Sequence, residues 1–102
     1  MTRKAIKEKI LIAINKDPRK KDFKRVSLFG SYAYGKPSKR SDVDVLIEFF
    51  PKTQIGYFEL SRIQRSIQKE VKKKIDLLTP GAISKFFRRE VIDKAEQIYG
   101  KR

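Results

Sequence analysis

Cysteine and histidine are both absent from this chain of 102 residues. Without cysteine there is no disulfide framework, no thiolate metal site and no cysteine nucleophile. Without histidine, the commonest general base and the usual zinc ligand are missing as well. Any acid–base or metal chemistry must therefore rest on carboxylates, whose oxygens suit hard cations such as Mg²⁺.

Long apolar runs are also lacking, and this bears on where the chain resides. The longest uninterrupted apolar stretches are only a few residues, which is too short to cross a bilayer. Residues 1–15, MTRKAIKEKILIAIN, carry charges throughout and are typical of an amphipathic helix rather than of a signal peptide. We expect a cytoplasmic protein with no membrane span.

Acidic residues are few, with 12 Asp and Glu against 26 Lys and Arg, so the formal net charge is +14. Such a charge favours attraction to nucleic acid, to nucleotide phosphates or to an acidic protein. A lysine-rich surface that serves solubility or a high growth temperature explains the composition equally well. The basic residues are spread along the whole chain, so charge alone does not identify a partner.

The length and the 39% apolar content indicate one domain with a small core. Apolar residues recur at helical spacing in 3–15, in 55–71 and in a last helix whose predicted apolar face is Ile83, Phe87, Val91 and Ala95. Strands are predicted at 26–30, 42–50 and 72–80, and QIYG near the end is a candidate extra strand. The first two strands are too close for a crossover helix, so we expect them to be antiparallel or joined by a short helical turn. The predicted fold class is α/β (α+β), a small mixed sheet flanked by helices.

Two aspartates interrupt the second predicted strand, DVDVLIEFF. Asp42 and Asp44 are two residues apart and so project to one face, where each raises the pKa of the other unless a cation lies between them. Taken alone, the pair is better explained as solvated carboxylates at an exposed strand start. Asp76, between Ile75 and Leu77, is a third carboxylate in an apolar strand. If the two strands are neighbours, the three carboxylates converge, which favours a magnesium site.

The other aspartates lack such a setting. Asp17 and Asp22 lie in a basic connector, and Asp93 lies on a charged helix face. We interpret all three as ordinary surface residues.

The first predicted strand ends at Gly30, Ser31 follows it, and ten residues separate Ser31 from Asp42. A strand that ends in glycine and continues with serine and a helical turn presents backbone N–H groups and a hydroxyl to an anion such as phosphate. The plain alternative is a turn in which Ser31 serves as an N-cap. The fixed distance to the aspartates favours the phosphate site.

Together, Gly-Ser, ten residues, Asp-x-Asp and a later lone Asp resemble the signature of the DNA polymerase beta-like nucleotidyltransferases. The block FGSYAYGKPSKRSDVDVLIEF, residues 29–49, and the chain length resemble the minimal nucleotidyltransferases (MNT) of bacteria and archaea. This resemblance spans the first helix through Asp76 and implies a single domain over residues 1–102.

The resemblance implies transfer of a nucleoside monophosphate, AMP from ATP, to an acceptor hydroxyl with release of pyrophosphate. Asp42 and Asp44 would ligate two Mg²⁺ ions, and Asp76 would complete the ion nearer the acceptor and favour deprotonation of the hydroxyl. The residues implied for phosphate binding are Gly30 and Ser31 for the β- and γ-phosphates, with Lys39, Arg40 and Ser41 as further candidates.

One departure from the family pattern concerns Tyr34, where many relatives carry arginine. A basic side chain near the triphosphate is therefore missing. Lys36, Lys39 or Arg40 would supply the missing positive charge. An equally good interpretation is that these three residues are solvated charges of a loop. Tyr32 and Tyr34 would stack on a base or pack on the helix, and packing is favoured.

The resemblance also implies a partner. Minimal members are often encoded beside a HEPN-domain ribonuclease toxin and act as its antitoxin, and members of the group adenylylate a tyrosine of that toxin. An alternative is a non-catalytic module of the same fold that neutralises its partner by contact, which a broken carboxylate set would indicate. The complete set of three aspartates favours the enzyme, whereas self-association stays open.

A basic nucleic-acid-binding protein is the less favoured alternative. It would present aromatic residues interleaved with basic ones on an exposed face. Phe23, Phe86 and Phe87 lie near lysines and arginines, but we expect them to pack against the rest of the protein.

Overall fold

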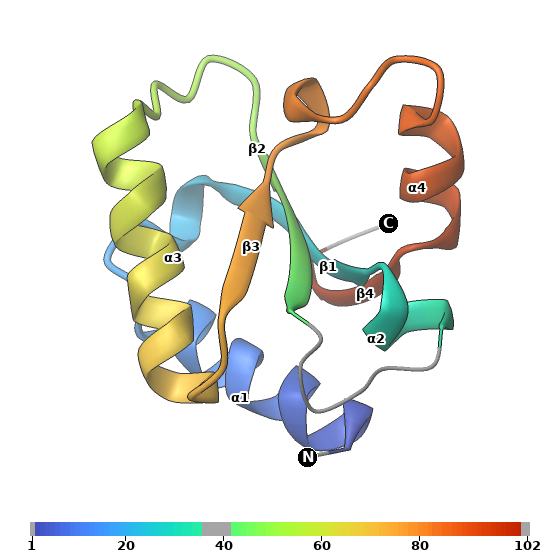
Figure 1. Ribbon diagram of the computed structural model, residues 1–102. Helices are drawn as coiled ribbons and strands as arrows, with labels where there is room; N and C mark the ends of the chain where they lie inside the picture. Colours follow the sequence, from blue (N-terminus) through green and yellow to red (C-terminus); the bar gives the residue numbers. More distant parts are fainter. Residues whose placement is uncertain (1, 36–41, 101–102) are drawn as a thin grey trace.

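A four-stranded sheet of order β3-β2-β1-β4 forms the centre of the computed structural model, which describes residues 2–35 and 42–100 (Figure 1). β1 is antiparallel to β2 and β4, whereas β2 and β3 are parallel. The mixed sheet, the antiparallel first pair and the extra C-terminal strand confirm the prediction. The strands are β1 (Phe23–Phe29), β2 (Val43–Phe49), β3 (Ile75–Leu78) and β4 (Glu96–Gly100).

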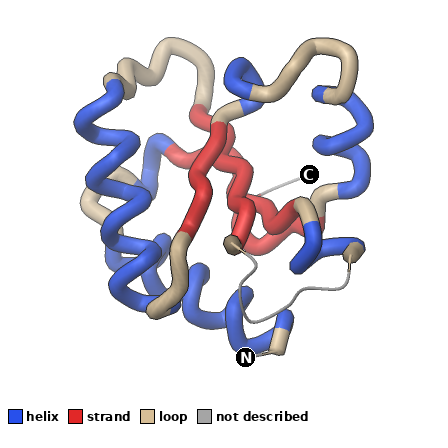
Figure 2. The backbone as a smooth tube through the Cα atoms, in the orientation of Figure 1, coloured by secondary structure: helices blue, strands red, loops and turns tan. Residues whose placement is uncertain are grey.

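Helices α1 and α3 lie together on one side of this sheet, and α2 and α4 lie toward the other side (Figures 1 and 2). α1 begins where the Thr2 hydroxyl accepts a hydrogen bond from the Ala5 N–H at 3.1 Å, the usual N-cap arrangement. Within the described parts of the chain, no helix is long and apolar enough to cross a membrane. The helices are α1 (Arg3–Lys16), α2 (Ser31–Tyr34), α3 (Tyr57–Val71) and α4 (Arg88–Lys94), with short 3₁₀ turns at Lys20–Asp22 and Pro80–Ala82.

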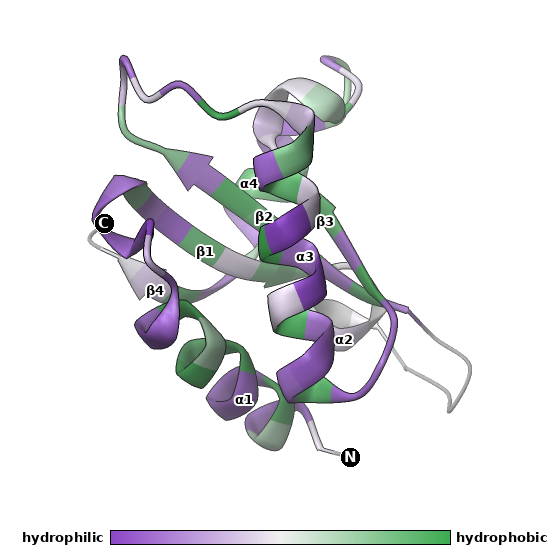
Figure 3. Cartoon of the chain, turned by 90° about the vertical axis from the view of Figure 1, so that its left-hand side faces the viewer, coloured by the Kyte–Doolittle hydropathy of each residue, from purple (hydrophilic) through white to green (hydrophobic). Residues whose placement is uncertain are grey.

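The core lies between the sheet and the pair α1 and α3. Alternate residues of β2 point into it, because successive side chains of a strand take opposite faces. Figure 3 shows apolar residues on α1 and α3 where these helices meet the strands. The fully buried members of this core include Val43, Val45 and Ile47 of β2, Ile6, Ile10 and Ile14 of α1, and Ile63 of α3.

The opposite face of β2 carries Asp44, Leu46 and Glu48. Leu46 is buried there, so β2 is apolar on one face and mixed on the other. The residues that lie opposite these three on β1 are Phe29, Ser27 and Arg25. The two aspartates of the strand motif therefore do not interrupt the core.

The C-terminal helix is shorter than predicted. α4 covers only Arg88–Lys94, and Phe87 is 60% exposed. The predicted apolar face is wrong because Pro80–Ala82 form a separate 3₁₀ turn, and the α-helix begins only at Arg88, after Ile83 and Phe87. Packing of Phe86 was also wrongly predicted, since its side chain is 83% exposed.

Asp17 was wrongly interpreted as a surface residue. Its side chain is almost fully buried, and its two carboxylate oxygens accept hydrogen bonds from Arg62 of α3 at 2.9 and 3.2 Å. Hydrogen bonding to Asp17 is the main reason why the pKa of Arg62 is raised above its ordinary value. This ion pair ties the end of α1 to α3. Asp22 pairs with Arg19 at 2.8 Å, and Asp93 is exposed as predicted.

Candidate active site

Asp44 and Asp76 lie directly opposite each other on the parallel strands β2 and β3. Their neighbours on both sides, Val43 opposite Ile75 and Val45 opposite Leu77, are buried in the core. Because side chains at paired positions share a face of the sheet, both carboxylates project from the face away from the core. The predicted convergence is thus found for these two aspartates.

Asp42 lies one residue before β2 and not inside the strand. The Val43 N–H donates to the Lys74 carbonyl at 3.0 Å, which places Asp42 beside the start of β3. Its Oδ2 lies 3.7 Å from Lys74 Nζ, and 45% of its side chain is exposed. Among the residues that the structure describes, no three acidic side chains are arranged to enclose a metal ion.

The charges of Asp76 and Asp42 nevertheless act unfavourably on the ionised Asp44. The pKa of Asp44 is raised above its ordinary value, first by partial burial, then by the charge of Asp76 and then by that of Asp42. A cation placed among them would reverse this effect, since opposite charge favours the ionised carboxylate.

The donor set fits a hard cation, because the three candidate ligands are all carboxylates. Asp44 and Asp76 are held on adjacent strands, whereas Asp42 would exchange its contact with Lys74 for the ion. That contact is solvent-exposed, with Lys74 at 75%, and exposed ion pairs contribute about 1 kcal/mol or less.

The Gly-Ser and Asp-x-Asp parts of the sequence motif meet at Gly30. Its φ is +71°, and a Cβ atom added there would lie 3.1 Å from Cγ of Asp44 and closer still to Oδ2. A side chain is excluded by both the backbone conformation and the space. The chain therefore turns from β1 into α2 directly beside the Asp44 carboxylate, next to the ladder pair Phe29 and Asp44.

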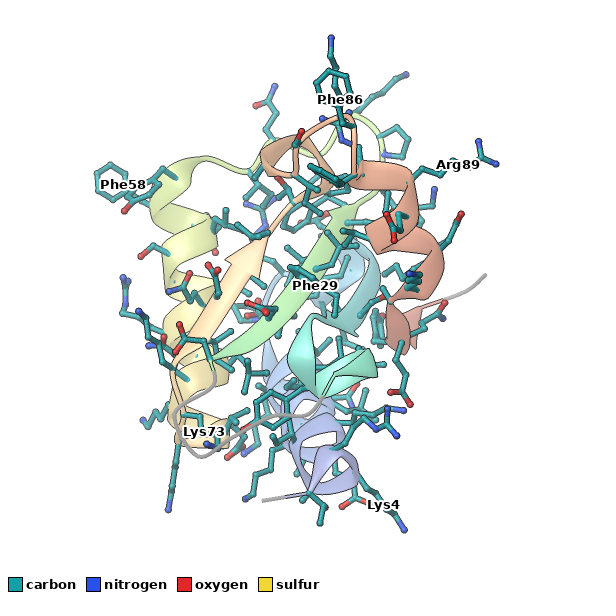
Figure 4. The ribbon with its side chains drawn as sticks, turned by 45° about the vertical axis from the view of Figure 1, so that its right-hand side comes forward. Lys4, Phe29, Phe58, Lys73, Phe86 and Arg89 are labelled. Carbon is teal, nitrogen blue, oxygen red and sulfur yellow. The ribbon has the colours of Figure 1, made fainter. Side chains whose placement is uncertain are left out.

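α2 is anchored by its own side chains. Tyr32 and Ala33 are 4% and 8% exposed, so Tyr32 packs in the core as expected and does not present its ring to a base. The Ala33 N–H donates to the Gly30 carbonyl at 3.1 Å. Lys73, at the start of the turn into β3, lies with Nζ 5.9 Å from the Tyr32 ring centre, and Figure 4 shows it at the end of α3.

The structure describes the remaining candidates only in part. Ser31 is the first residue of α2 and Tyr34 its last, but the placement of their side chains is not described. The candidates that lie outside the described residues are Lys36, Lys39, Arg40 and Ser41.

Sequence reasoning missed two basic residues at this site. Lys73 and Lys74 belong to a run of three lysines, residues 72–74, which precedes Asp76 and is typical of an ordinary basic turn. Only the register of β2 against β3 shows that Lys74 adjoins Asp42 and that Lys73 adjoins α2.

Comparison with known sequences gives one family. Residues 8–98 match the family described as nucleotidyltransferase domain. Two proteins of Methanocaldococcus jannaschii, each with the provisional name protein adenylyltransferase, are similar in sequence. One is 29% identical over 75 residues, covering 74% of this chain and 78% of the relative. The other is 30% identical over 71 residues, covering 70% and 71%.

Solved structures share the fold at low sequence identity. A minimal nucleotidyltransferase superposes with a TM-score of 0.76 at 20% identity, covering 93% of this chain and 94% of that one. A toxin–antitoxin complex with AMP-PNP gives 0.74 at 18%, covering 94% and 74%. A tri-AMPylated Shewanella oneidensis HEPN toxin in complex with its MNT antitoxin gives 0.69 at 16%, covering 98% and 74%. The chain therefore belongs to the nucleotidyltransferase domain family, and its fold is that of the minimal nucleotidyltransferases.

Proposed function

We propose that this nucleotidyltransferase is a magnesium-dependent protein adenylyltransferase that moves AMP from ATP to a tyrosine hydroxyl of a HEPN-domain toxin. It would thereby act as the antitoxin of that toxin, in the cytoplasm, where ATP is available. The observation that carries the proposal is the alignment of Asp44 with Asp76 beside Gly30, within a chain of this family.

The residues have distinct roles in this proposal. The Gly30–Ser31 turn would receive the β- and γ-phosphates next to Asp44. Asp42 and Asp44 would hold two Mg²⁺ ions, and Asp76 would complete the ion nearer the acceptor. When bound, Mg²⁺ supplies neutralisation of the triphosphate charge and favours deprotonation of the acceptor hydroxyl.

The reaction then needs positioning more than covalent chemistry. The acceptor oxygen forms a bond to the α-phosphorus as the bond from that phosphorus to the bridging oxygen of the β-phosphate breaks. Pyrophosphate leaves, and the hydroxyl proton passes to solvent. The rigid pairing of β2 with β3 would keep Asp44 and Asp76 aligned throughout.

Support for a protein partner comes from the similar proteins and not from the residues of the site. The names of the Methanocaldococcus jannaschii relatives and the AMPylated HEPN toxin bound to an MNT antitoxin point to a protein acceptor. The net charge of +14 favours partners of the opposite sign, ATP included.

The two alternative functions, a non-catalytic binding module and a nucleic-acid-binding protein, have different support. A non-catalytic module would be indicated by a broken carboxylate set, and all three aspartates are present. Nucleic-acid binding gains one feature, since the exposed Phe86 and Phe87 stand between Lys85 and Arg88, but both belong to a single short segment before α4.

ATP labelled at the α-phosphate tests the proposal. We would incubate it with Mg²⁺, a HEPN-domain toxin and the chain, and follow the label. We expect label on a toxin tyrosine with the wild type and with the surface control Asp93→Asn, and none with Asp44→Asn. ATP labelled at the γ-phosphate should leave the toxin unlabelled. Absence of transfer by the wild type, or equal transfer by Asp44→Asn, would refute the assignment.

A further inference from the structure

α2 is a single helical turn and needs support from other parts of the chain. A helix of four residues is too short to be stable by itself, and its last carbonyl groups have no partners inside the helix. One of these carbonyls, that of Ala33, accepts a hydrogen bond of 2.6 Å from Nη1 of Arg3. Arg3 is the first residue of α1, thirty positions earlier in the chain.

Arg3 is itself held by the C-terminal strand. Its Nη1 lies 3.5 Å from Oε2 of Glu96, the first residue of β4, and Lys7 Nζ lies 2.7 Å from Oε1 of the same carboxylate. Glu96 Oε2 is buried and accepts no hydrogen bond from any described residue. The nearby positive charge of Arg3 offsets the cost of burying this oxygen. Glu96 pairs with Leu28 of β1, two residues before Gly30.

We propose that Arg3 is a positioning residue for nucleotide binding. From α1 it holds the Ala33 carbonyl, and it thereby keeps the Gly30–Ser31 turn in place against Asp44. Glu96 orients the guanidinium from β4. This inference rests on the proposed function, which assigns that turn to the triphosphate.

Arginine suits this role better than lysine. Its planar guanidinium offers five N–H donors in a fixed geometry and can serve a carbonyl and a carboxylate at once, whereas a lysine ammonium is a point charge on a flexible stem. The first residues of α1 therefore act on the site without touching the nucleotide.

The test compares ATP affinity, measured by calorimetry with Mg²⁺, among variants of the full chain. Lys4→Met is the matched control, because Lys4 carries the same charge one residue further on and points away from the molecule (Figure 4). We expect Arg3→Met to raise the Kd for ATP about tenfold, equivalent to about 1.4 kcal/mol, and Lys4→Met to change it less than about twofold. Arg3→Lys should fall between them, and Glu96→Gln should weaken binding in the wild type but not in Arg3→Met.

Hydrogen exchange of the nucleotide-free chain gives the second readout. Arg3→Met should speed exchange in residues 31–35 while β2 and α3 keep their protection. At saturating ATP, the transfer rate of Arg3→Met should return toward that of the wild type, since the loss is in affinity.

Several outcomes would overturn the inference. An Arg3→Met chain that binds ATP like the wild type would do so, as would faster exchange throughout the chain, which would show a general loss of stability. Failure of the wild type to bind ATP would instead refute the proposed function, and the role of Arg3 with it.

Discussion

Asp44 occupies a strand without disturbing the core because strand side chains alternate. Val43 and Val45 are fully buried on one face, and Asp44 projects from the other beside Asp76. The arrangement costs free energy, as the raised pKa of Asp44 shows. The proposed metal-binding role would account for this cost in the centre of a sheet.

Gly30→Ala tests the contact between the turn and Asp44. The added Cβ would require a strained backbone and displacement of the Asp44 carboxylate, so we expect a loss of at least about 1–2 kcal/mol in the free energy of unfolding. ATP binding should weaken as well. Urea unfolding and calorimetry measure the two effects.

Gly81→Ala is the matched control for this substitution. No described atom lies within 4 Å of a Cβ built there, so stability and ATP binding should stay close to those of the wild type. Equal behaviour of the two variants would contradict the close approach of Gly30 to Asp44.

The pH dependence of Asp44→Asn follows from the raised pKa. Because folding raises the pKa of Asp44 above 3.8, the native chain binds this proton more tightly than the unfolded chain does. The ionised carboxylate therefore lowers stability increasingly as pH rises from 3.8 through the folded pKa, and fully above it. Without Mg²⁺, Asp44→Asn should raise the urea midpoint at pH 7, and the gain should vanish below pH 3.8.

The opposite sign would count against repulsion in this cluster. A lower urea midpoint for Asp44→Asn at pH 7 would show that the ionised carboxylate stabilises the fold. Asp93→Asn, on the exposed face of α4, serves as the control for loss of a single negative charge.

Among the elements, the four strands could be predicted and the last helix poorly. Strand periodicity and the short link between the first strands indicated the mixed sheet, and the motif residues indicated its polar face. The sequence pattern could not show that Ile83 and Phe87 lie outside a helix, because the 3₁₀ turn at Pro80–Ala82 overrides the apolar spacing.

Apart from the approach of Asp44 to Asp76, contacts between distant elements could not be predicted from the sequence. Asp17 looked like a loop residue, yet its partner Arg62 lies 45 positions away on α3. The same holds for Arg3 and Glu96, which meet where the start of α1 lies beside β4. Local patterns carry no information about such pairs.

Substitution of two phenylalanines tests how differently the buried sheet and the exposed loop before α4 contribute to stability. Phe23 is 2% exposed and packs edge-on against Phe49 at 5.7 Å, whereas Phe86 is 83% exposed. Phe23→Ala should cost about 3–5 kcal/mol of unfolding free energy, and Phe86→Ala about 0.5 kcal/mol or less. Urea unfolding of both variants measures this, and a large loss for Phe86→Ala would show that the loop packs against the protein.

The two faces of the sheet differ in the whole molecule. One face packs against the hydrophobic core, and the other carries the candidate active site. α1 and α3 cover the core face and α2 adds Tyr32 and Ala33 to the core, while Asp44 and Asp76 project from the opposite face beside Gly30. The positive charge of +14 is spread over the chain and favours ATP and an acidic partner without specifying either. The proposed function assigns the acceptor hydroxyl to the partner toxin.

Calorimetric titration of ATP into the pure protein, with and without Mg²⁺, tests the central claim most directly. The variants are the wild type, the double variant Asp42→Asn, Asp44→Asn and the control Asp93→Asn. The account predicts magnesium-dependent binding by the wild type and the control, and its loss in the double variant. Equal binding by all three, or none by the wild type, would contradict the claim that the aspartates hold the metal of a nucleotide.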